Sequence, residues 1–179
     1  MDRDVIPDTL YGRLLGDDYA RLQPTVASLH ACSGLRRYSG NVVVERGSTL
    51  LSRLCAWATR LPPAGQGPID VDIDADADGE TWTRHVAGHA MRSRLRAHDG
   101  LLRERLGLVT FDFRLLVEDA GLRWQVVRVR AFGIPLPRDA FKGVVARESE
   151  RDGRYTFDVR AALPLAGLLV HYCGELDVG

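Results

Sequence analysis

Residues 69–100 read IDVDIDADADGETWTRHVAGHAMRSRLRAHDG, and this stretch determines the fold class. Apolar and acidic side chains alternate with a period of two over residues 69–77, as expected of a strand with one buried face. Turn residues then recur at short intervals, at Gly79, at Gly88 and at the Asp99-Gly100 pair. Tight turns between short strands are typical of antiparallel hairpins, whereas parallel strands need long crossover connections.

The same pattern continues towards the C-terminus. Further strands are expected over residues 80–86, 91–97, 101–106, 109–118, 122–132, 144–150, 154–159 and 168–176. About nine closely spaced strands predict a strongly curved antiparallel meander in a mainly β (α+β) domain. Because a sheet of this length curls or closes, we expect a half-open or closed barrel, analogous to a calycin-like cup.

Helical segments are expected before the sheet and beside it. Residues 8–33 contain an N-cap candidate at Asp8 and a first-turn proline at Pro24. Turns are expected around Gly34 and Gly40, followed by a short strand over residues 41–46. A covering helix is expected over residues 48–60, with Ser48 as its N-cap.

The covering helix has its apolar side chains at helical spacing, which predicts that this face packs into the core. These residues are Leu50, Leu51, Leu54, Cys55, Trp57, Ala58 and Leu61. Together the patterns predict one domain over residues 1–179, with the sheet over residues 67–177.

The composition and charge exclude several classes of protein. The chain has 179 residues, of which 45% are hydrophobic and 27% charged, as in ordinary globular domains. The 24 basic residues balance 24 acidic ones, which disfavours nucleic acid as a partner. No apolar run approaches the roughly 18 residues of a membrane span.

The N-terminus and the cysteines indicate a cytoplasmic location. Residues 1–4 are mostly charged and lead into no apolar segment, so a signal peptide is not expected. Cys32, Cys55 and Cys173 are odd in number and widely spaced, and they form no CxxC pair. Reduced, small apolar side chains are therefore expected at these positions, without disulfides.

Two patterns are candidates for metal binding. Asp74, Asp76 and Asp78, followed by Gly79, have the spacing of a calcium loop, but His85 replaces the bidentate glutamate such a loop needs. We favour a hairpin with these acids on its solvent face and keep calcium as the alternative. His85, His89 and His98 fall at strand ends and turns in a period-two context, so exposed histidines are expected there, and no metal.

The arginines point to a lined cavity. Of the 24 basic residues 23 are arginine, which pairs with carboxylate or phosphate groups through two parallel hydrogen bonds. Arg92, Arg94 and Arg96 alternate with apolar residues and are expected to face solvent. Arg84 shares a strand face with Trp82, and Arg130 shares one with Trp124, a mixture typical of binding cavities.

Two functions follow from such a cavity. The first is binding of an apolar small molecule that carries an acidic group, because a buried arginine needs an anionic partner. The ligand would contact Trp82, Arg84, Trp124, Arg130 and Tyr172. The second is a cofactor-independent isomerase, cyclase or hydrolase, with Glu104 or Glu148 as base and His30 as proton carrier. No GxGxxG, GxxxxGK[ST] or GxSxG motif is present, so no nucleotide cofactor is expected.

Several short phrases occur in a characteristic order from about residue 8 to residue 176. They include Tyr11-Gly12-Arg13-Leu14-Leu15-Gly16, Ser28-Leu29-His30, Arg46-Gly47, Trp82-Thr83-Arg84, Gly133-Ile134-Pro135-Leu136-Pro137 and Tyr172-Cys173-Gly174. In this series the chain resembles a family of uncharacterised bacterial domains, found alone or fused to saccharopine-dehydrogenase-like or membrane proteins. It departs from the usual phrase at Val86, where an aromatic residue is common.

The resemblance implies one compact domain and no established catalytic residues. The fusions add a third hypothesis, a protein-interaction module whose partner is a second copy or a fused domain.

Overall fold

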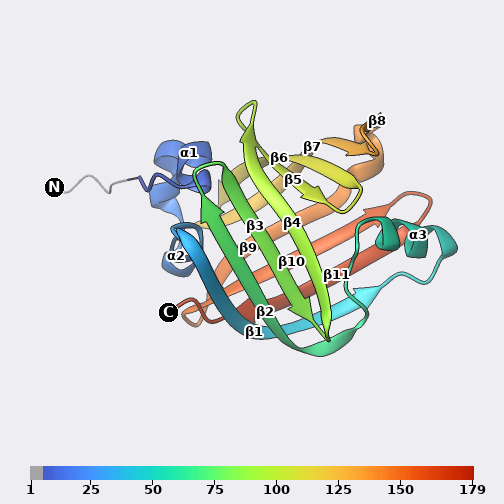
Figure 1. Cartoon of the computed structure of the whole chain (residues 1–179), viewed down its shortest axis with the longest axis horizontal. Coiled ribbons are helices and arrows are strands. Elements are labelled where there is room, and N and C mark those ends of the chain that lie inside the picture. The colour runs from blue at the N-terminus through green and yellow to red at the C-terminus, as the bar shows by residue number, and fades with distance from the viewer. Residues whose placement is uncertain (1–5) are drawn as a thin grey trace.

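The computed structural model describes residues 6–179 and shows a closed antiparallel β-barrel (Figure 1). The ring consists of β1 (Gly34–Arg46), β2 (Gly65–Asp76), β3 (Gly79–Val86), β4 (His89–His98), β5 (Leu101–Leu106), β6 (Val109–Glu118), β7 (Gly121–Ala131), β9 (Gly143–Arg151), β10 (Arg154–Leu163) and β11 (Gly167–Leu176). Each strand pairs with the next, and β11 returns to pair with β1. The barrel prediction is confirmed. The charged residues 1–4 lie outside the described part of the chain.

The strands alternate between the barrel interior and the outer surface. In β2, Ile69, Val71 and Ile73 are buried, whereas Asp74 and Asp76 on the outer face are exposed. This alternation follows from the pleat, which sends successive side chains to opposite faces. The predicted β2–β3 hairpin with outward-facing acids is therefore confirmed.

Short helices cover one end of the barrel, and a separate helix lies at the other end (Figure 1). The first group consists of α1 (Leu10–Leu15), the 3₁₀ helix η1 (Gly16–Arg21) and α2 (Pro24–His30). The opposite end carries α3 (Leu50–Ala58). A further 3₁₀ turn, η2 (Arg138–Phe141), precedes β9. None of the helices within residues 6–179 is long and apolar enough to cross a bilayer.

The N-caps differ from the expected ones by one residue. Thr9 caps α1 in place of Asp8, and Thr49 caps α3 in place of Ser48. In each case the threonine hydroxyl accepts a hydrogen bond from the backbone N–H three residues later. Both residues have the short side-chain oxygen that a cap needs, so the sequence located the helix starts only to within a residue.

The expected turn around Gly40 is wrong, because β1 runs without interruption from Gly34 to Arg46. A Cβ atom at Gly40 would lie 1.8 Å from the carbonyl oxygen of Glu175 in β11. Gly40 therefore serves the close approach of two strand backbones, a role that glycine also fills in strands. The expected loop over residues 133–137 likewise contains a short strand, β8 (Ile134–Leu136), which pairs with β7 outside the ring.

The prediction that the apolar face of α3 packs into the core is also wrong. Leu50, Leu54 and Trp57 are 83%, 60% and 71% exposed, whereas Ser52 and Ala56 are buried. The small side chains allow the helix to lie directly on the strand ends, and the large ones point away. Helical periodicity shows that a face exists but not what covers it.

We predict that Gly40→Ala destabilises the barrel, because the added methyl group collides with backbone that cannot move without breaking the β1–β11 pairing. The expected loss in the free energy of unfolding is about 3 kcal/mol, measured by urea denaturation.

Gly67→Ala is the matched control, since a Cβ at that position of β2 has no atom within 4 Å. A loss at Gly40 no larger than the loss at Gly67 would show that the close approach carries no strain.

Candidate functional site

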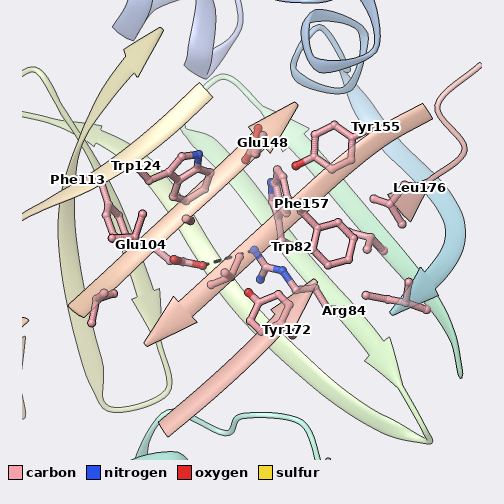
Figure 2. Close-up of a pocket in the computed structure, with 16 residues that line it drawn as sticks. Trp82, Arg84, Glu104, Phe113, Trp124, Glu148, Tyr155, Phe157, Tyr172 and Leu176 are labelled. Carbon is pink, nitrogen blue, oxygen red and sulfur yellow. Dashed lines mark ion pairs between the residues drawn. The ribbon is translucent and has the colours of Figure 1, made fainter. Parts of the chain in front are cut away.

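A cavity of about 80 Å³ lies inside the barrel (Figure 2). Its apolar wall includes Phe113, Val159 and Leu176, and Trp82 and Trp124 contribute their rings. The polar side chains that line it are Arg84, Glu104, Glu148, Tyr155 and Tyr172. Four of these five polar residues are candidates from the sequence, and Tyr155 is the one that the sequence analysis did not identify. The cavity thus combines apolar walls with a few polar groups, as binding sites do.

Arg84 lies near the centre of the cavity and is only partly satisfied. Its Nη1 donates to the Ser93 hydroxyl at 3.0 Å, and its Nη2 is 3.7 Å from Oε1 of Glu104. The guanidinium carbon lies 5.0 Å from the centre of the Trp82 ring, a cation–π arrangement. A guanidinium has five N–H donors, so these contacts leave donors directed at the cavity.

Arg84 keeps its charge despite its burial. Burial alone lowers the pKa of Arg84, but the Glu104 carboxylate opposes this effect, and the net shift is upward. The Glu104 carboxylate is therefore a necessary counter-ion, because an isolated buried charge is very costly.

A second polar pair joins the helical cap to the barrel. His30, the last residue of α2, is hydrogen-bonded through Nε2 to Oε2 of Glu148 in β9 at 2.5 Å. A second hydrogen bond also attaches α2 to β9, because the Glu150 carboxylate accepts from the backbone N–H of Thr25 at 2.9 Å. The structure thus brings the two sequence candidates His30 and Glu148 into contact, and both side chains are buried, but only Glu148 is among the residues that line the cavity.

An aromatic cluster surrounds the His30 ring. Tyr11 of α1 stacks on it with the two ring centres 3.6 Å apart. The centre of the Trp82 ring lies 6.0 Å from the centre of the His30 ring. Three buried polar atoms of this cluster have no hydrogen-bond partner within residues 6–179: the Tyr11 hydroxyl, His30 Nδ1 and Trp124 Nε1. Unsatisfied buried groups are rare in folded proteins and often mark functional sites.

Glu80 is a buried carboxyl that the sequence did not single out. Its Oε2 accepts a 2.7 Å hydrogen bond from Trp82 Nε1, and its Oε1 has no partner among the described residues. Burial raises the pKa of Glu80, and the nearby His30 and the Trp82 hydrogen bond offset only part of this effect. The alternation in β3 carries the signal, because Glu80 shares the inward face of Trp82 and Arg84.

The tyrosines of the cavity remain protonated donors. The Tyr155 hydroxyl is directed towards Glu148 (Figure 2), and burial, followed by the charge of Glu148, raises the pKa of Tyr155 well above its usual value. Burial also raises the pKa of Tyr172, although the charge of Arg84 opposes this shift. Both hydroxyl groups can therefore donate to an acceptor inside the cavity.

The prediction that Arg130 lines the cavity is wrong. A β-bulge interrupts the β6–β7 pairing, where Phe113 faces Val126 and Asp112 faces Arg128, which leaves Val127 as the extra residue. Beyond the bulge Val129 is buried, and Arg130 lies on the outer side. One inserted residue reverses the alternation of inward and outward side chains. An assignment of faces that starts at Trp124 is therefore wrong for the residues after Val127.

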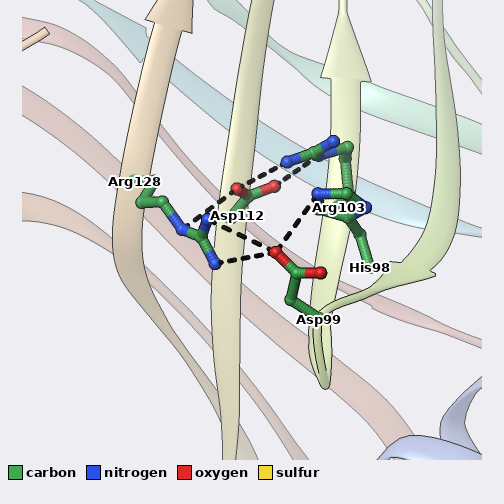
Figure 3. A network of polar contacts seen from close by, with 5 residues as sticks. All are labelled: His98, Asp99, Arg103, Asp112 and Arg128. Carbon is green, nitrogen blue, oxygen red and sulfur yellow. Dashed lines mark hydrogen bonds and ion pairs between the residues drawn. The ribbon is translucent and has the colours of Figure 1, made fainter. Parts of the chain in front are cut away.

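The bulge places Arg128 in an outer-face network (Figure 3). Asp112, which is buried, accepts two hydrogen bonds from Arg103, at 2.6 and 2.8 Å. Arg128 and His98 both contact Asp99 at 3.4 Å, and Arg128 also lies 3.5 Å from Asp112. Burial raises the pKa of Asp112, but Arg103 outweighs it and the net shift is downward. These arginines are structural.

The other sequence candidates lie apart from the cavity. Asp76 accepts hydrogen bonds from the backbone N–H groups of Asp78 and Gly79, which shapes the β2–β3 turn. Among residues 6–179, no group of three or more His, Cys, Asp or Glu side chains is arranged to hold a metal ion. The histidines have separate partners: His85 contacts Asp72, and His89 contacts the carbonyl of Arg60.

The three cysteines are free thiols, of which Cys32 is buried and Cys55 and Cys173 are partly exposed. Burial raises the pKa of Cys32 to about 11, with a smaller contribution from Glu80, which makes this thiol unreactive at neutral pH.

Residues 22–176 match the family model described as Domain of unknown function (DUF4166). The chain belongs to this family. The match confirms the resemblance to a domain family without an assigned function. The DUF4166 segment contains His30, Arg84, Glu104, Glu148 and Tyr172, whereas Tyr11 precedes it. No curated protein matches the chain.

We predict that Glu80 makes the free energy of unfolding depend on pH. The pKa of Glu80 is higher in the folded than in the unfolded chain, so its contribution to stability falls as pH rises from about 4 through the folded pKa. Glu80→Gln removes this loss but keeps an acceptor for Trp82. The variant should therefore gain stability relative to the wild type between about pH 4 and about pH 7.

Urea unfolding at both pH values measures this difference. Asp152→Asn, which neutralises an exposed carboxylate in the β9–β10 turn, is the control and should show no such gain. The prediction fails if the two variants respond to pH alike.

Proposed function

We propose that the barrel interior binds a small organic anion and that Arg84 is its charged partner. The observation that carries the proposal is the incomplete satisfaction of Arg84. A buried guanidinium with one hydrogen bond at 3.0 Å and an ion pair as long as 3.7 Å retains N–H donors for another acceptor. A carboxylate is the group that fits such a planar donor set best.

The dimensions of the cavity limit the ligand. A volume of about 80 Å³ corresponds to about five water-sized sites, and thus to a ligand of about five non-hydrogen atoms. Short carboxylic acids with one or two apolar carbons meet this limit. Phe113 and Val159 would contact the carbons, while the Tyr155 and Tyr172 hydroxyls would donate to remaining oxygens.

A titration of the protein with short carboxylates and with their neutral amides tests this proposal. We expect the wild type to prefer the carboxylates, and Arg84→Gln to bind them at least about tenfold more weakly. Calorimetry or NMR chemical shifts would measure the affinities. Arg114→Gln, an exposed arginine on the outer face of β6, should bind like the wild type.

Arg84→Gln leaves Glu104 without its counter-ion and could lose stability for that reason. The double variant Arg84→Gln/Glu104→Gln removes both charges and should fold while still failing to discriminate carboxylate from amide. Equal affinity for both ligand types in the wild type, or absent binding, would exclude the anion site.

A second candidate function is acid–base chemistry on the bound molecule, and the His30–Glu148 pair favours it. Glu148 lines the cavity and is hydrogen-bonded to His30, whose two ring nitrogens can accept or donate a proton. This pair would support proton exchange next to a carbonyl group. Glu148 takes the proton, the electron pair of the broken C–H bond moves onto the carbonyl oxygen beside Arg84, and Glu148 returns a proton to the same carbon after exchange through His30.

Incubation of a bound short keto acid in D₂O tests this chemistry. The wild type should catalyse loss of the proton signal next to the carbonyl, and Glu148→Gln should slow the exchange at least about a hundredfold. Glu175→Gln, a partly exposed glutamate in β11, is the control. Binding without faster exchange would restrict the protein to ligand binding.

A further inference from the structure

The barrel end that carries α3 exposes large apolar side chains from several elements. Leu50, Leu54 and Trp57 project from α3, Leu165 from the β10–β11 turn, and Phe132 from the β7–β8 turn. Scattered apolar residues are normal on a protein surface, but a gathered set marks an interaction site. Whether these side chains form one patch depends on how the elements are joined.

Backbone and side-chain hydrogen bonds link these elements side by side. Thr49, the cap of α3, donates its hydroxyl to the carbonyl of Ala166 next to Leu165. At the other end of the helix, the N–H of Leu108 donates to the carbonyl of Ala58, and the N–H of Phe132 donates to the carbonyl of Leu108. α3 therefore lies between these turns at one end of the barrel, and the exposed apolar side chains of α3 and of the two turns are together called the α3 patch.

Arginines flank the α3 patch without acidic partners. A groove beside α3 is lined by Trp57 and Leu108 together with Arg53 of α3, Arg60 just after the helix and arginines of β4 and β5, and its lining contains no aspartate or glutamate. The exposed arginines of the groove are Arg53, Arg60, Arg92, Arg94 and Arg105. Within residues 6–179, none of these five forms an ion pair. The groove therefore favours an anionic partner.

The opposite end of the barrel has the reverse character. Its turns carry Asp78, Asp99, Asp119 and Asp152, all exposed. The turns at the α3 end contain Ala87, Leu108, Phe132 and Leu165. The balanced net charge of the chain thus conceals a charge asymmetry along the barrel axis, which orients the molecule in the field of a charged surface.

We propose that the α3 patch docks onto the surface of an anionic lipid bilayer. The apolar side chains of α3 would enter the interface between headgroups and acyl chains, and the flanking arginines would contact lipid phosphates. A polyanion such as nucleic acid would engage the arginines but leave the leucines in water. A symmetric dimer through this end would bring the arginines of the two copies together, which costs free energy.

The tryptophans provide a specific readout. Trp57 is exposed, whereas Trp82 and Trp124 are buried in the barrel and are the other tryptophans of the chain. Insertion at a bilayer should shift the fluorescence of Trp57 to shorter wavelength and protect it from aqueous quenchers. The experiment uses the full chain with phosphatidylcholine vesicles, with and without phosphatidylglycerol, and measures binding by flotation.

We expect binding only to the vesicles that contain phosphatidylglycerol, and weaker binding at high salt. Leu54→Ser/Trp57→Ser and Arg53→Glu/Arg60→Glu should each reduce flotation at least about tenfold, because they remove apolar contact or reverse charge. Leu35→Ser/Arg36→Glu alters exposed residues at the start of β1, near the helical end, and should float like the wild type.

Three results would overturn the proposal. The first result is that the protein does not float with anionic vesicles. If heparin or DNA binds in that case, the groove is a polyanion site. Another is equal binding to neutral vesicles. The third is a dimer in light scattering that Leu54→Ser/Trp57→Ser converts to a monomer, which would assign the patch to a second copy.

Discussion

Closure of the strand ring between β7 and β9 and between β11 and β1 is the constraint on which the rest of the structure depends. Once the ring is closed, every second side chain along its strands is removed from water. For the valines and leucines this removal is the main source of stability. For Arg84, Glu104 and Glu148 it is costly, so these residues persist only because each has a partner within the same interior.

The interior therefore contains charge that packing alone would not select. Arg84 is balanced by Glu104, Glu148 by His30, and Glu80 by the Trp82 indole, yet several of their donors and acceptors remain unsatisfied. An apolar barrel core of equal volume would be at least as stable. Buried polar groups around a cavity, with raised pKa values of Glu80 and Tyr155, are an arrangement that is common at functional sites, and it supports the proposed binding site.

Period-two alternation predicted most of the fold because each strand has one face inside the closed barrel. The same rule placed Trp82, Arg84 and Tyr172 in the cavity, and it contained the signal for Glu80 and Tyr155. It failed at Val127, where one additional residue reverses the faces and puts Arg130 outside. It also could not identify Gly40 as a point of strand contact, because that role depends on β11, far away in the sequence.

The hydrogen bond between His30 and Glu148 has a consequence for the helical end of the barrel. His30 belongs to the cap and Glu148 to the wall of the cavity, so one contact serves both. A molecule that engaged Glu148 in the cavity would therefore alter the attachment of α2, so that the stability of the cap and the occupancy of the cavity would be thermodynamically coupled. The helices of the cap would then respond to what the cavity contains, in addition to closing one end of the barrel.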